Sequence, residues 1–128
     1  DTVTLGTQVT TGTIDLAGGT DRLTLGNFAN TVTLSNIESV IGGTSSDVIT
    51  LGTAAVGNVI NLGSGIDTLI LGAFNNTVSV GGVETLTGGT SDDIVTLTAS
   101  ASAMTVDLGS GTDTLLLGDF ANTVTITG

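Results

Sequence analysis

The chain has 128 residues, a net charge of −11, 20 glycines, and no Lys, His, Cys, Trp, Tyr or Pro. With Arg22 as its only base, it cannot neutralise nucleic-acid phosphates, and anionic membranes are unsuitable partners. Catalytic triads need His or Cys, and a sugar-cleaving carboxylate pair needs a shaped cleft. We therefore predict a non-enzymatic protein whose natural partners are cations, and no membrane insertion.

A repeat of 46 residues runs through the whole chain. Segment 30–34 returns at 76–80 and again at 122–126. We interpret the chain as one solenoid segment with repeats 1–46, 47–92 and 93–128, part of a longer chain or fibre. The other residues that recur at this spacing are Asp1, Asp47 and Asp93; Asp21, Asp67 and Asp113; and Phe28, Phe74 and Phe120.

Short segments with alternating apolar residues predict strands, because successive side chains of a strand point to opposite faces. One set follows the aspartates and begins near residues 2, 22, 48, 68, 94 and 114. A second set begins near residues 13, 31, 59, 77, 105 and 123. The pattern predicts a right-handed parallel β-solenoid of about six coils, in which each 46-residue repeat forms a double coil.

Three further features complete the predicted solenoid. Leu, Ile and Val of both strand sets should fill a narrow core between two facing sheets, with the phenylalanines plugging the rod. Residues 36–41 and 82–87 should form a third short side or a bulge. Glu38 and Glu84 lie in these segments, where they are either solvated or hold a further cation or a partner.

The aspartate turns resemble the nonapeptide G-G-x-G-x-D-x-U-x of the RTX calcium-binding proteins, where U is a large aliphatic residue. Segments 42–50 and 88–96 match it except that a serine replaces the fourth-position glycine. Segments 62–70 and 108–116 keep the second and fourth glycines but lose the first. In that family, successive turns hold calcium between aspartate carboxylates and backbone carbonyls. The resemblance implies bound calcium, in a number that the degenerate turns leave open.

The charge pattern supports calcium independently. The six repeated aspartates should form one column along a single edge of the rod. Like charges so close together oppose stacking unless a hard cation with oxygen ligands bridges them. In the alternative, each aspartate accepts N–H bonds from its own turn. The candidate metal ligands are Asp21, Asp47, Asp67, Asp92, Asp93 and Asp113.

These features together predict a structural repeat module at the bacterial cell surface or outside the cell. It would extend an adhesin, or build a surface layer, biofilm matrix or fibre, with calcium stiffening the aspartate turns. Open strand edges would allow end-to-end self-association. One alternative is an ice-binding solenoid that uses outward Thr-x-Thr rows such as Thr31 and Thr33, and another is a metal-free self-assembling fibre subunit.

Overall fold

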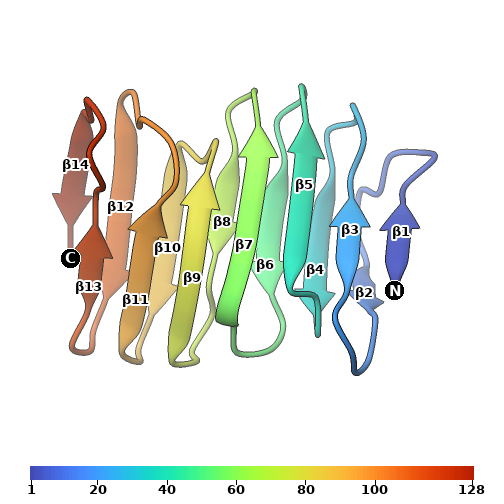
Figure 1. The fold of residues 1–128 in the computed structure, drawn as a ribbon, viewed down its shortest axis with the longest axis horizontal. Coiled ribbons are helices and arrows are strands. Elements are labelled where there is room, and N and C mark those ends of the chain that lie inside the picture. Colours follow the sequence, from blue (N-terminus) through green and yellow to red (C-terminus); the bar gives the residue numbers. More distant parts are fainter.

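The computed structural model describes residues 1–128 as an all-β solenoid with two seven-stranded parallel sheets. Successive strands alternate between the sheets, so one strand of each sheet makes one coil (Figure 1). From β1 to β13 the chain completes six turns, which confirms the predicted parallel β-solenoid of about six coils. The odd-strand sheet contains β1 (Thr2–Thr4), β3 (Arg22–Thr24), β5 (Ser39–Gly43), β7 (Val56–Gly63), β9 (Asn76–Gly81), β11 (Asp93–Leu97) and β13 (Thr114–Leu116).

The second sheet lies behind the first in Figure 1, and the first and last coils lie at opposite ends of the rod. Paired residues are 20 positions apart at Thr2 and Arg22 and 17 apart at Arg22 and Ser39, and these are the two usual coil lengths. No helix has the length and hydropathy of a membrane span. The even-strand sheet contains β2 (Thr13–Asp15), β4 (Thr31–Ser35), β6 (Val48–Leu51), β8 (Thr68–Ile70), β10 (Thr85–Gly89), β12 (Met104–Gly109) and β14 (Val124–Thr127).

The 46-residue repeat spans two and a half coils, so the predicted double coil is wrong. The residues expected to form a third short side instead contribute to β5 and β10, which pair within the sheets. Each complete repeat, 1–46 and 47–92, therefore contains five strands rather than four. Because five is odd, equivalent residues of successive repeats lie on opposite sheets: Leu23 is in β3 of the odd-strand sheet and Leu69 in β8 of the even-strand sheet.

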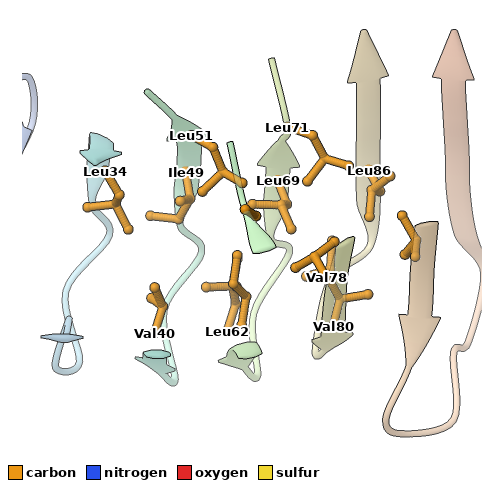
Figure 2. Packing of buried hydrophobic residues seen from close by; sticks show 14 of the residues in the cluster. Leu34, Val40, Ile49, Leu51, Leu62, Leu69, Leu71, Val78, Val80 and Leu86 are labelled. Carbon is orange, nitrogen blue, oxygen red and sulfur yellow. The ribbon is translucent and has the colours of Figure 1, made fainter. Parts of the chain in front are cut away.

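The core is a single layer of aliphatic side chains between the sheets. In Figure 2, Leu34, Ile49 and Leu69 of the even-strand sheet face Val40 and Leu62 of the odd-strand sheet. All five are buried, as the alternation predicted for every one except Val40. Burying an aliphatic side chain of this size stabilises by roughly 1.5–3 kcal/mol before the entropy cost. Since no coil buries its own apolar face, the stack depends on contacts between neighbouring coils.

The phenylalanines do not plug the interior. Phe28 and Phe74 are half-buried in corner turns, and Phe120 is exposed. A Cβ added to Gly26 would lie 3.2 Å from the Phe28 ring. Each ring therefore folds back over the glycine two residues before it and covers the outside of the turn.

Glycines form a column at each of the two corners of the rod, where one sheet passes to the other. At one corner, a Cβ added to Gly43 would lie 2.3 Å from the carbonyl oxygen of Gly26 in the preceding coil. At the other, the corresponding distance from Gly89 to the Gly72 oxygen is 2.2 Å. These distances exclude any side chain. The glycine columns are Gly26, Gly43, Gly63 and Gly82 at one corner, and Gly72, Gly89 and Gly109 at the other.

Candidate functional site: two corner ladders

Polar side chains form a ladder at the corner where the odd strands lead into the even strands. We call this the even-strand ladder; it comprises Asn30, Asp47, Asp67 and Glu84. In each step, the backbone N–H of one member donates to a side-chain oxygen of the next member, one coil further on. The distances are 2.8 Å from Asn30 to Asp47 Oδ1, 2.7 Å from Asp47 to Asp67 Oδ1, and 2.8 Å from Asp67 to Glu84 Oε2. The ladder therefore ties four successive coils together outside the strands.

The opposite corner carries the same arrangement, which we call the odd-strand ladder. The N–H of Asp21 donates to Glu38 Oε2 over 2.7 Å. After an interruption, the N–H of Asn76 donates to Asp93 Oδ1 over 3.0 Å and that of Asp93 to Asp113 Oδ1 over 2.8 Å. The half-coil offset of the repeats explains why equivalent residues build both corners.

The predicted single column of aspartates is therefore wrong. Asp47 and Asp67 lie at one corner, whereas Asp21, Asp93 and Asp113 lie at the other. The alternative prediction, that the aspartates accept backbone N–H bonds, agrees with the type of hydrogen bond in the structure. The donors, however, belong to the preceding coil and not to the aspartate's own turn. These bonds consequently join coils instead of closing turns.

One carboxylate oxygen in several rungs has no partner. Each of these side chains is at most 2% exposed, and its Oδ2 is buried without a hydrogen bond. A buried and unpaired carboxylate oxygen is costly, because the charged form loses water without compensation. The four side chains are Asp21, Asp47, Asp67 and Asp93.

The environment of Asp67 favours the protonated form of its carboxyl. Burial is the main cause that raises its pKa to about 6, and the neighbouring carboxyls of Asp47 and Glu84 raise it further. The hydrogen bond from the Asp47 N–H acts in the opposite direction. Protonation of Asp67 is thus favoured in the folded chain compared with an ordinary aspartate.

Asp92 and Asp93 are adjacent in sequence, but their side chains have different surroundings. The Asp93 side chain is buried in the ladder, whereas Asp92 is exposed. Asp92 Oδ1 accepts the N–H of Thr112 in the next coil over 2.7 Å. The two carboxyls, both among the candidate metal ligands, therefore lie on different sides of the backbone.

The ladder residues fit a calcium ion poorly. Calcium takes six to eight oxygen ligands, usually with several carboxylates converging on it. Here the acidic side chains are strung along the corners, and no group of three or more could hold a metal ion. In each inner aspartate, one carboxylate oxygen already accepts a backbone N–H bond. The unpaired Oδ2 atoms are the remaining candidates for an ionic contact, and calcium binding stays a prediction.

Asparagine and glutamate were missed as ladder members. Asn30 and Asn76 hold ladder positions, and their Nδ2 groups also donate to Asp47 and Asp93 Oδ1 over 3.0 and 2.9 Å. Glu38 and Glu84 accept N–H bonds and are not simply solvated. For the asparagines, the available signal was their position immediately before the strands predicted near residues 31 and 77. The glutamates precede β5 and β10, which were not predicted as strands.

A second candidate surface is the outer face of the even-strand sheet. Its register aligns two rows of outward residues across the coils. Thr77 and Ser79, which form a similar Thr-x-Ser pair in the sequence, lie on the opposite sheet. The rows are Thr31, Val48, Thr68, Thr85, Thr105 and Thr125; and Thr13, Thr33, Thr50, Ile70, Thr87, Asp107 and Thr127.

Comparison with family models, with curated proteins and with solved structures finds no match for this chain.

Proposed function

We propose that the chain is a structural repeat module, a stiff spacer in a secreted or surface-attached bacterial protein. The observation that carries this proposal is the unbroken stack of coils, with its first and last coils at opposite ends (Figure 1). Six steps of about 4.8 Å give a rod about 30 Å long, and each additional repeat would add about 12 Å. Adhesin extenders, surface layers, biofilm matrices and fibres all need a unit that lengthens in this way.

Open strand edges support assembly of the module into something longer. Within residues 1–128, β1, β2, β13 and β14 each pair with only one neighbour. Unpaired strand edges are templates for another strand. Flanking repeats or a second copy of the chain would cover them, and the proposed fibre and matrix roles use this property.

The spacer role is tested by lengthening the rod. Inserting one additional copy of residues 47–92 after Asp92 should increase the maximum dimension in small-angle X-ray scattering by about 12 Å, at constant cross-section. A flexible 46-residue Gly/Ser insert at the same point is the control, since it should broaden the distance distribution instead. A thicker particle of unchanged length would contradict the spacer role, and a concentration series reports end-to-end association.

Ice binding is the second candidate function, and the threonine rows favour it. Seven aligned outward positions of the even-strand sheet hold five threonines: Thr13, Thr33, Thr50, Thr87 and Thr127. The matching seven-residue row of the odd-strand sheet holds only Thr2 and Thr96. Since both faces consist of exposed strands, the β-propensity of threonine alone does not explain the difference.

Ice binding predicts that bulky residues on one face abolish activity. Replacing Thr68 and Thr85, which are paired on the even-strand sheet, by tyrosine should eliminate thermal hysteresis and ice faceting. The matched control replaces Ser79 and Thr96, which are paired on the odd-strand sheet, and should leave activity unchanged. No hysteresis in the unmodified protein, or equal loss from both faces, would contradict this function.

A further inference from the structure

The ladder position accepts three different residue types. An asparagine, two aspartates and a glutamate occupy successive rungs of the even-strand ladder, and each accepts an N–H from the preceding coil. The bond from the Val9 N–H to Asn30 Oδ1, at 3.0 Å, is close in length to the 2.7 Å bond accepted by Asp67 Oδ1. A neutral amide thus accepts the same hydrogen bond between coils as a carboxylate. What the rungs share is a carbonyl-type oxygen, not a charge.

The surroundings of the ladder disfavour charge. Asp67 lies between Asp47 and Glu84, the acidic residues of the coils on either side. The single base of the chain, Arg22, is exposed on the outer face of the odd-strand sheet, between Thr2 and Ser39 in register. With no basic side chain beside the even-strand ladder, its fully ionised rungs would repel one another at the spacing of adjacent strands. In the odd-strand ladder, the N-terminal ammonium of Asp1 pairs with Asp21.

The carboxylates differ from the amides in having a second oxygen that accepts no hydrogen bond. In Asp47, Asp67 and Asp93, Oδ1 accepts the interstrand N–H, whereas Oδ2 is buried and unpartnered. An amide at the same position keeps the oxygen and removes the charge. Asn30 illustrates this substitution, because its Nδ2 donates to the carbonyl of Phe28 over 2.8 Å.

We propose that the two corner ladders hold the coils together by hydrogen bonds to carbonyl-type side-chain oxygens, and that neither negative charge nor a bound metal ion is needed for the solenoid to fold. The poor fit of the strung-out acids to a calcium site is the structural basis of this inference. The inference is independent of the spacer role, which would survive either outcome.

The test compares two substitutions at Asp67 in urea unfolding at pH 7, with and without calcium. Asp67→Asn keeps the acceptor and should unfold at the same urea concentration as the unmodified protein, or at a higher one. Asp67→Ala leaves the buried N–H of Asp47 unpaired and should lower the folded-to-unfolded ratio by about 5- to 150-fold. Asp93→Asn at the opposite corner provides a second neutral variant.

Metal dependence is measured in the same experiment. The unmodified protein should give the same unfolding curve in excess chelator and in millimolar calcium. The inference would be overturned if chelator unfolded the protein, if calcium raised its unfolding midpoint, or if the Asn variants lost as much stability as Asp67→Ala. Unchanged curves together with stable Asn variants support it.

Discussion

Replacing Gly89 with alanine is expected to destabilise the solenoid by about 3 kcal/mol or more. The added Cβ would lie 2.2 Å from the carbonyl oxygen of Gly72 in the preceding coil. That oxygen belongs to the backbone, so no side-chain rotation relieves the overlap. Adjacent coils would have to separate at this corner, which would also stretch the nearby ladder bonds. Urea unfolding monitored by circular dichroism measures the loss.

Substitutions at two other glycines are controls that distinguish this steric overlap from the other effects of an alanine substitution. Gly6 has nothing within 4 Å of an added Cβ, so Gly6→Ala should leave stability nearly unchanged. Gly57 is equally open but has a φ of +79°, so Gly57→Ala should cost only the backbone strain of about 1–2 kcal/mol. If Gly89→Ala were as mild as Gly6→Ala, the close approach of the coils would be wrong.

Stability is expected to fall as the pH rises from about 4 to about 6. Asp67 has a pKa of about 6 in the folded chain, compared with an ordinary value of 3.8. Between these values the folded state binds more protons than the unfolded state, so raising the pH favours unfolding. The stabilisation from the proton is complete below about pH 4 and is lost above pH 6. The difference of about two pH units corresponds to about 3 kcal/mol at most.

A series of urea unfolding curves at constant ionic strength tests this dependence. Asp67→Asn is the matched control, because it cannot titrate and should flatten the profile between pH 4 and 6. At lower pH a different group acts: the hydrogen bond from Asn36 and then that from the Ala17 N–H lower the pKa of Asp15, so its contribution is lost below pH 3.8. A stability that rises steadily from pH 4 to 7 would contradict the role assigned to Asp67.

Local pattern was sufficient to predict the class of fold and most of the core. Period-two alternation places Leu23 and Leu69 inward in whichever sheet their strands lie, because it depends only on the residues on either side. The glycines that open the corner turns and the aspartates that end them, such as Gly63 and Asp67, were also recognisable. What a pattern of this kind identifies is therefore the inside of each coil and the position of its turns.

The sequence did not reveal how the coils are registered against one another. Residues 36–41 and 82–87 were predicted to form a third short side or a bulge, whereas Ser39–Gly43 and Thr85–Gly89 proved to be the strands β5 and β10. Because of these two strands, each complete repeat contains five strands instead of the predicted four.

The sequence by itself determined most of the residues that point inward, the position of most corners and that the repeats stack. Only the tertiary structure decided that the aspartates divide between two corners and that the threonines gather on the even-strand sheet. The physical reason is parity: with an odd number of strands in each repeat, every repeat begins half a coil out of phase with the last. Whether one weakly patterned segment becomes a strand depends on the coils that pair with it, and so on contacts far away in sequence.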